Sequence, residues 1–327
     1  VAIGAGFACG GFCIQFGCDW VAFLYASIAA ILGMRLRQVC NESGLNHYMG
    51  IAISAFVATI IAWASTLLPA EWTSTPWHPL LACALFIVPG VPLINFVDDM
   101  LDNYIQVGIV RAVNTLLMVA AMAFGIAFAV KLCHIENFFP TISMVPHHAY
   151  WEYAIAAAIS AMGFSMIFNI QRRLLWVVAI GGIIAVCTRN FVNLGPSTDN
   201  IGLDMGLVIG SFSGSVLVSL IAVKAVHWFH VPGHVLTIPS VIPMIPGVLM
   251  YRMLFGLINM NVQTIDQVTP LMKAIESGVN SGLVIMCIAL GVAIPNIFGR
   301  KYIASSKNKR LAAILKERKA RGKFVEW

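Results

Sequence analysis

Two proline–glycine pairs interrupt apolar stretches of this sequence. Pro89-Gly90 lies within IVPGVPLINFVDD, and Pro246-Gly247 lies within IPSVIPMIPGVLMYR. Proline lacks a backbone amide donor and clashes with the preceding helical turn, while glycine adopts backbone angles that other residues resist. A regular helix is therefore not expected through either segment. The free carbonyl and amide groups of such breaks are suited to binding a small polar molecule.

Polar side chains follow each pair. Asn95 and Arg252 occupy matching positions after the two pairs, and Tyr251 directly precedes Arg252. A charged side chain inside a bilayer costs at least about 2.5 kcal/mol on insertion scales, so an arginine at this depth indicates function, here a forked pair with a carboxylate. The predicted substrate-binding residues are Pro89, Gly90, Asn95, Pro246, Gly247, Tyr251 and Arg252.

Acidic residues are concentrated after the first pair. Asp98 and Asp99 are candidates to carry a coupling proton, because burial raises the pKa of a carboxyl group toward neutrality. The alternative is that these acids lie in a cytoplasmic connection, where they are solvated or paired with Arg111. The predicted residues for proton coupling or ion pairing are Asp98, Asp99, Asp102 and Arg111.

The elements that hold these residues are predicted to be transmembrane helices. Of the 327 residues, 59% are hydrophobic and 10% are charged, whereas a soluble domain carries about 25% charged residues. The mean hydropathy is +0.86, and the apolar stretches recur at about 20 residues, the length of helix that crosses about 30 Å of hydrocarbon. We predict ten spans, near 1–17, 20–36, 49–69, 79–98, 106–131, 150–170, 173–191, 202–226, 235–257 and 279–299.

An internal repeat predicts how these spans are arranged. Three segments recur in the same order: FACGGFCIQF at 7–16 matches ISAMGFSMIF at 159–168, ISAF at 53–56 matches IGSF at 209–212, and IVPGV at 87–91 matches MIPGV at 244–248. Each half would hold five spans, an odd number, so the second half would cross the membrane in the opposite sense, as in many secondary transporters. A duplicated bundle without a transport role is the alternative.

The predicted fold is an all-α membrane protein of about ten transmembrane helices in two inverted five-helix repeats, with broken helices at the Pro-Gly segments. Residues 1–140 and 150–300 form the repeats, and residues 301–327 form a basic tail. Ten of the twenty Lys and Arg lie between Arg300 and Lys323, which favours a cytoplasmic C-terminus over a nucleic-acid arm. Residue 1 is Val within an apolar run, which we interpret as a chain whose upstream part is missing.

The sequence does not support a disulfide framework, a metal site or an enzyme mechanism. The eight cysteines show neither paired C-x-x-C spacing nor clustering with histidine, so neither a disulfide framework nor a metal site is expected, and no cofactor is predicted. His147 and His148 precede the sixth predicted span in a loop expected to be external. The sequence contains no phosphate-binding loop, nucleophile elbow or H-E-x-x-H motif, so we predict no catalytic residues and no enzyme activity.

Two segments carry a family resemblance. IVPGVPLINFVDDMLDNYIQVGIVR, from Ile87 to Arg111, and IPMIPGVLMYRMLFGLI at 242–258 resemble the two halves of the threonine/serine exporter family. The resemblance covers most of the chain, although only these segments are specific. It implies export of threonine and serine driven by the proton motive force. The tandem Asp98-Asp99 departs from the Gly-Asp that often stands there in the family, which leaves the role of each acid open.

The expected function is secondary transport of small polar amino acids out of the cytoplasm, across a bacterial inner membrane that the chain crosses many times. The expected partners are the substrate (threonine, serine or a dicarboxylate), protons and membrane lipids, but not nucleic acid; a homo-oligomer is compatible with this function. One alternative is export of a dicarboxylate such as succinate, because family members split between two proteins are associated with it. Another alternative is a channel-like pore for small metabolites.

Overall fold

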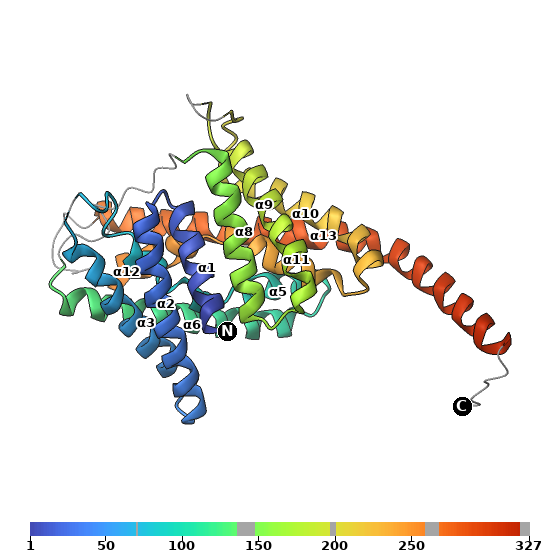
Figure 1. Ribbon diagram of the computed structural model, residues 1–327, viewed down its shortest axis with the longest axis horizontal. Coiled ribbons are helices and arrows are strands. Elements are labelled where there is room, and N and C mark those ends of the chain that lie inside the picture. Colours follow the sequence, from blue (N-terminus) through green and yellow to red (C-terminus); the bar gives the residue numbers. More distant parts are fainter. Residues whose placement is uncertain (70, 136–147, 197–200, 259–267, 321–327) are drawn as a thin grey trace.

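Helices form every regular element in the part of the chain that the computed structural model describes, namely residues 1–69, 71–135, 148–196, 201–258 and 268–320 (Figure 1). The predicted all-α class is therefore confirmed for these residues. In chain order the α-helices are α1 (Ala2–Gln15), α2 (Trp20–Glu42), α3 (His47–Trp63), α4 (Pro79–Ala82), α5 (Gly90–Leu101), α6 (Ile105–Leu132), α8 (Tyr150–Ile167), α9 (Leu175–Asn193), α10 (Leu207–Phe229), α11 (Gly233–Val241), α12 (Gly247–Ile258) and α13 (Val268–Ala320). Short 3-10 helices are η1 (Ala64–Leu67), η2 (Leu85–Ile87), η3 (Arg172–Leu174) and η4 (Ile242–Met244).

Several of these helices are able to cross a bilayer. Within the described residues, six are long and apolar enough, and the number rises to eight if each of two bent pairs is one span. The bent pairs are α4/η2 with α5, which meet at 54°, and α11/η4 with α12, which meet at 61°. Neither α1 nor α8 is among the six. With 14 residues, α1 is about 21 Å long, which is shorter than the hydrocarbon core, so the predicted count of ten spans is not reached.

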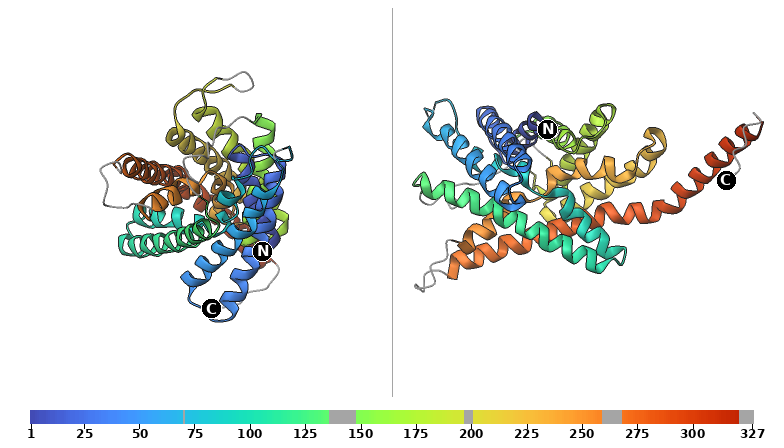
Figure 2. Two further views of the ribbon diagram at one scale, coloured as in Figure 1. Left: turned by 90° about the vertical axis from the view of Figure 1, so that its left-hand side faces the viewer. Right: turned by 90° about the horizontal axis from the view of Figure 1, so that it is seen from below.

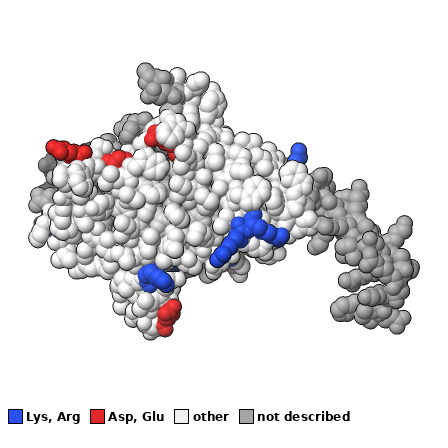
Figure 3. Space-filling model, viewed as in Figure 1, with Lys and Arg blue, Asp and Glu red and all other residues white. Residues whose placement is uncertain are grey.

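Large apolar side chains cover the outside of the molecule, as expected for a chain that faces lipid. Val110 and Phe124 of α6 are 70% and 62% exposed, and Trp228 of α10 is 77% exposed. On the face drawn in Figure 3, acidic side chains lie mostly along the upper edge and basic side chains mostly along the lower edge, with a broad uncharged band between them. A protein in water would expose few such patches, so the surface supports a membrane location.

Two helices continue well past the predicted spans. The second span was expected near 20–36, yet α2 continues to Glu42 and projects from the body of the molecule (Figure 1). The last span was expected near 279–299, yet α13 runs for 53 residues, and its C-terminal part extends far to the side (Figures 1 and 2). Hydropathy marks only the part of a helix that faces lipid, whereas polar residues such as Arg, Lys, Gln and Glu continue the helix into water.

The closest helix pairing joins the two segments that carry the first sequence match. α1 and α8 are antiparallel, because a Cβ at Gly4 would lie 2.7 Å from the Gly163 carbonyl oxygen and a Cβ at Gly11 would lie 2.6 Å from that of Ala156. Only glycine permits this approach of the backbones. The Phe12 and Phe164 rings meet edge to face at 5.7 Å.

These contacts follow the sequence repeat: when both residues of a contact are replaced by their counterparts in the other half, the result is again an observed contact. The repeat pairs Gly11 with Gly163, an offset of 152 (163 minus 11). The same offset maps the contact of Gly11 with Ala156 onto the contact of Gly163 with Gly4, and it makes Phe12 and Phe164 contact their own equivalents. Reciprocal contacts of this kind are what a two-fold axis between two copies generates.

An aspartate fastens the turn between α1 and α2 to the loop before α4. Asp19 Oδ1 accepts the backbone N–H of Ala22 at 2.7 Å and so caps α2. Its Oδ2 accepts the Thr73 hydroxyl at 2.8 Å and the Ser74 backbone N–H at 2.7 Å. Burial raises the pKa of Asp19, but these hydrogen bonds outweigh it, so that the pKa lies below its ordinary value of 3.8.

The close backbone packing at the α1/α8 crossing predicts that substitution of a glycine there destabilises the fold more than substitution of a glycine with free space around it. A Cβ at Gly163 would collide with the backbone of Ala8 and Gly4, whereas one at Gly282 in α13 would meet nothing within 4 Å. We expect Gly163→Ala to cost about 1–3 kcal/mol of stability, and Gly282→Ala to be neutral or to gain up to about 1 kcal/mol from helix propensity. Thermal unfolding in detergent measures both. Equal melting temperatures for the two variants would contradict this packing.

The hydrogen bonds that Asp19 accepts predict that the stability of the fold depends on pH. Because its folded pKa is lowered, Asp19 stabilises the fold above the pKa of the unfolded chain and loses this contribution as the pH falls through the folded value. Asp19→Asn should lower the melting temperature at pH 7, at a cost of about 1 kcal/mol, and should then decline less than the parent between pH 5 and pH 3. Glu71→Gln, at an exposed position of the same loop, serves as the control and should follow the parent throughout.

Candidate functional site

Both Pro-Gly segments are breaks between helices, as the sequence predicts, and their backbones follow the same course. In the first, the amide of Val88 donates to the Leu85 carbonyl at 3.1 Å and the amide of Gly90 donates to that of Val88 at 2.7 Å. In the second, Ile245 donates to Ile242 and Gly247 donates to Ile245, both at 2.9 Å. Every partner is displaced by 157 residues. The repeat therefore extends from the sequence to the local backbone.

The two breaks lie against each other. A Cβ at Gly90 would approach the Ile245 and Ile242 side chains to 2.9 and 3.1 Å, and a Cβ at Gly247 would approach Leu85 and Val88 to 2.7 and 3.2 Å. These contacts are again reciprocal under the 157-residue offset. Segments far apart in the sequence thus place two irregular stretches of backbone together in the interior of the fold, where apolar side chains cover them.

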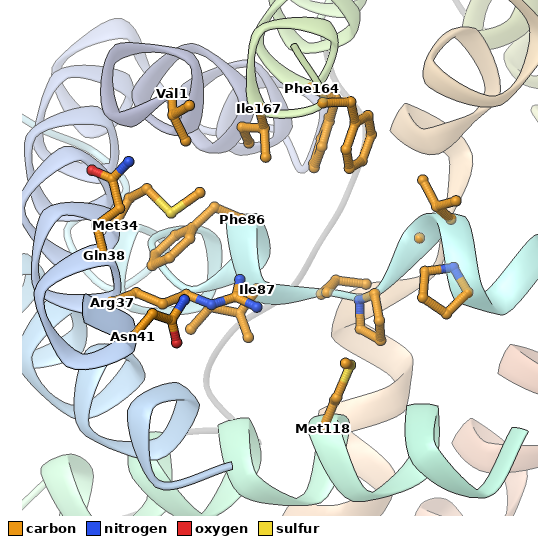
Figure 4. A pocket seen from close by; sticks show the side chains of 16 residues that line it. Val1, Met34, Arg37, Gln38, Asn41, Phe86, Ile87, Met118, Phe164 and Ile167 are labelled. Carbon is orange, nitrogen blue, oxygen red and sulfur yellow. The ribbon is translucent and has the colours of Figure 1, made fainter. Parts of the chain in front are cut away.

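A pocket opens beside the first break. It has a volume of about 340 Å³, enough for a small metabolite. Its wall is formed by α2, α6 and α8, by Val1 directly before α1, and by the break. Figure 4 shows Arg37, Gln38 and Asn41 on one wall, Phe164 and Ile167 above, and Met118 below. The lining residues are Val1, Met34, Arg37, Gln38, Asn41, Phe86, Ile87, Val88, Pro89, Gly90, Val91, Pro92, Met118, Phe164, Ile167 and Phe168.

One turn of α2 supplies the polar groups of this pocket. Arg37 and Asn41 are four residues apart, which places them on one helix face, and Gln38 is adjacent. Arg37 and Ile87, which directly precedes the break, both line the pocket (Figure 4). Among the described residues Arg37 forms no ion pair, and the buried Gln38 Oε1 accepts no hydrogen bond. The pocket therefore offers a fork of donors for an anion and an acceptor for an N–H or O–H group.

The predicted binding residues divide between the pocket and its surroundings. Pro89 and Gly90 line the pocket. Gly247 lies on the far side of the first break, against Leu85 and Val88, and Pro246 directly precedes it; neither lines the pocket. Asn95 lies one to two turns into α5, and Arg252 lies at the matching place in α12. The side chain of Tyr251 lies outside the described residues.

The predicted acidic residues lie at the C-terminal end of α5, away from the pocket wall. Asp99 forms an ion pair with Arg111 of α6. In the sequence analysis, such pairing is the alternative to proton coupling. Asp98 precedes it in α5, and Asp102 is the C-terminal cap of that helix. All three carboxylates are half-buried. The structure thus joins Asp99 to Arg111 and places neither beside Arg37.

Sequence reasoning missed the three polar residues of the pocket. The predicted second span ends near residue 36 with the apolar stretch, so it does not include Arg37 and the residues after it. The available signal was helical spacing: Arg37, Gln38 and Asn41 continue α2 by one turn. Only the packing of that turn against Phe86 and Ile87 identifies them as wall residues, since their distance from the break in sequence is about fifty residues.

The arrangement is suited to binding a small anionic group. A single guanidinium, two amides and a backbone break surround an otherwise apolar space, and a carboxylate of a small molecule is the group that best matches them. Within the described part of the chain, no cluster of three or more His, Cys, Asp or Glu side chains is placed to hold a metal ion.

Curated relatives match part of the chain. "Probable succinate transporter subunit YjjP" of Klebsiella aerogenes is 32% identical over 127 residues, which is 39% of this chain and 49% of that protein. The protein of the same description from Escherichia coli (strain K12) is 30% identical over 132 residues, which is 40% of this chain and 51% of that protein. The chain thus spans about half the length of these relatives. No solved structure matches the chain.

Two family models match the chain in succession. The model described as "Putative threonine/serine exporter" matches residues 1–133, and the model described as "Threonine/Serine exporter, ThrE" matches residues 153–298. The boundary between them lies between the two copies of the repeat, and each match contains one of the Pro-Gly breaks. Together with the apolar helices and the paired breaks, these matches show that the chain is a multi-pass membrane protein that belongs to the threonine/serine exporter family.

Proposed function

We propose that the chain is a secondary transporter that exports small polar amino acids, threonine and serine, across the bacterial inner membrane, coupled to the proton motive force. The observation that carries the proposal is the pocket at the first break, where Arg37, Gln38 and Asn41 face Pro89 and Gly90. Arg37 binds the substrate carboxylate, while the buried Gln38 oxygen accepts from its ammonium or hydroxyl group. The family supports export as the direction of transport.

The proposed architecture is ten membrane-crossing segments in two inverted halves, residues 1–140 and 150–300. The reciprocal contacts of α1 with α8 and of the two breaks support it, because two halves related by a two-fold axis in the membrane plane make such contacts. In this arrangement α1 and α8 cross the membrane together despite their short length, shielded by their neighbours. Rocking of one half on the other at this interface alternates access to the pocket.

The remaining predicted residues have supporting roles in this proposal. When the two halves adopt the alternate orientation, the substrate path is completed by residues in the helices that follow the breaks, namely Asn95, Tyr251 and Arg252. The second break along this path is formed by Pro246 and Gly247. The Asp99–Arg111 ion pair, with Asp98 and Asp102 nearby, joins the end of α5 to α6. The basic tail from residue 301 lies in the cytoplasm beside anionic lipid headgroups.

A second candidate function is export of a dicarboxylate. Of the described residues that line the pocket, Arg37 is a cation and none is an acid, so the lining offers a partner for a carboxylate but no side-chain carboxylate for an ammonium group. The curated relatives named as succinate transporter subunits favour the same class for their own proteins. Assembly with a second copy or a partner subunit is part of this candidate, because the relatives are named as subunits.

Efflux from proteoliposomes tests the function and separates the two substrates. Vesicles are loaded with labelled threonine, serine or succinate, and a pH gradient is imposed across the membrane. We expect gradient-dependent, saturable efflux of the hydroxy amino acids, with competition by the unlabelled compound. Efflux of succinate alone would replace the first candidate by the second. No gradient-dependent efflux of any of the three would contradict both.

Two arginines of α2 provide a matched test of the pocket. Arg37 lines the pocket, whereas Arg35 is exposed two residues earlier on the same helix. A hydrogen bond to a charged group contributes about 1.5–3 kcal/mol, so Arg37→Gln should weaken the apparent affinity for a carboxylate substrate by about 10- to 100-fold. Arg35→Gln should leave it within about two-fold. The half-saturating substrate concentration measures both, and equal effects would remove Arg37 from the site.

A further inference from the structure

A buried histidine lies at the end of the α1/α8 interface that is opposite to the pocket. His148 precedes α8 and is 9% exposed. Its Nε2 lies 2.8 Å from the carbonyl oxygen of Cys18, in the turn between α1 and α2, and its Nδ1 lies 2.9 Å from Glu152 Oε2. The same Glu152 oxygen accepts the backbone N–H of Ala149 at 3.2 Å. One imidazole thus bridges segments 130 residues apart.

The two contacts require an additional proton. A neutral imidazole has one N–H, but a carbonyl oxygen faces one ring nitrogen and a carboxylate oxygen faces the other, and neither of these groups donates when Glu152 is ionised. Both hydrogen bonds form only if His148 carries a proton on each nitrogen, or if Glu152 is itself protonated and donates to Nδ1. Either way, the pair holds one proton more than a neutral histidine and a carboxylate together.

The surroundings of the pair are polar and partly buried. Gln15 lies at the end of α1, level with Glu152 in the antiparallel packing of the two helices. It is 8% exposed, and neither polar atom of its amide has a hydrogen-bond partner in the described part of the chain. The Tyr153 ring lies 5.9 Å from that of His148. The titratable or charged groups that the described elements bring to this region are Cys18 and Asp19 from the turn, Tyr150, Glu152 and Tyr153 from α8, and Arg189 from α9.

The bridge is connected to the first break by a continuous set of contacts. Cys18, which accepts from His148, is followed by Asp19, and Asp19 holds Thr73 and Ser74 in the loop that leads to α4. α4 and η2 then lead directly into the break at Val88. Loss of the bridge therefore frees the α1–α2 turn from α8 at one end of the interface, while the pocket lies at the other end.

We propose that His148 and Glu152 form the binding site of the coupling proton, which holds the two halves of the chain together at this end of α1 and α8 when the proton is bound. This inference rests on the proposed function. The added proton resides on an imidazole nitrogen and completes the second hydrogen bond. Its release leaves the partly buried Glu152 carboxylate without that bond, so the halves separate here and the opposite end closes on the pocket. Protonation state and orientation of the halves are thereby linked.

Nitrogen-15 NMR of the full chain in nanodiscs, labelled at histidine, tests the site without transport. His148→Gln identifies the His148 signals, and the pH is varied from about 5 to 8, where histidines titrate. We expect a population in which both ring nitrogens of His148 carry a proton, and we expect Glu152→Gln, which lacks the negative charge, to reduce that population at a given pH. A single neutral tautomer throughout, or an unchanged population in Glu152→Gln, would overturn the proposal.

Transport by the same variants tests the coupling. His148→Gln should lose acceleration of efflux by a pH gradient at least about ten-fold while substrate exchange without a gradient continues; retention of the acceleration would overturn the coupling role. His134→Gln, at an exposed histidine after α6, should behave as the parent. If the parent protein moves none of the tested substrates, the proposed function fails, and the NMR titration alone decides whether the proton site exists.

Discussion

Backbone groups without hydrogen-bond partners are unstable in contact with lipid. The two breaks avoid this contact because they pack against each other. Gly90 and Gly247 permit the approach, because a Cβ at either would press on apolar side chains of the opposite break. In hydrocarbon an unpaired peptide group costs several kcal/mol, so each break depends on the other for cover. Beside the first break, one turn of α2 supplies the polar groups of the pocket wall (Figure 4).

The same symmetry governs the crossing of α1 and α8. Glycines at positions 4, 11 and 163 allow close backbone contact, and Phe12 meets Phe164 across the crossing. The pocket lies at one end of this crossing and the His148 bridge at the other.

Charged side chains are few in this chain, and two of its arginines lie in different surroundings. The Asp99–Arg111 pair is neutral as a unit and joins α5 to α6 near the surface. Arg37 forms no ion pair with a described residue and points into a space enclosed by apolar groups, which is costly unless an anion occupies that space. An arginine of the first kind stabilises a helix contact. An arginine of the second kind offers paired donors to a carboxylate.

The sequence by itself determined the helical class, the membrane location, the family and the two breaks, because composition, apolar length and Pro-Gly chemistry act locally. It also located Pro89 and Gly90 in the pocket and anticipated the pairing of Asp99 with Arg111. Tertiary structure alone decided that Arg37, Gln38 and Asn41 form the polar wall, and that His148 reaches Cys18. These contacts join residues about fifty and 130 positions apart, and hydropathy, which reports exposure to lipid, carries no information about which distant segment a helix end will face.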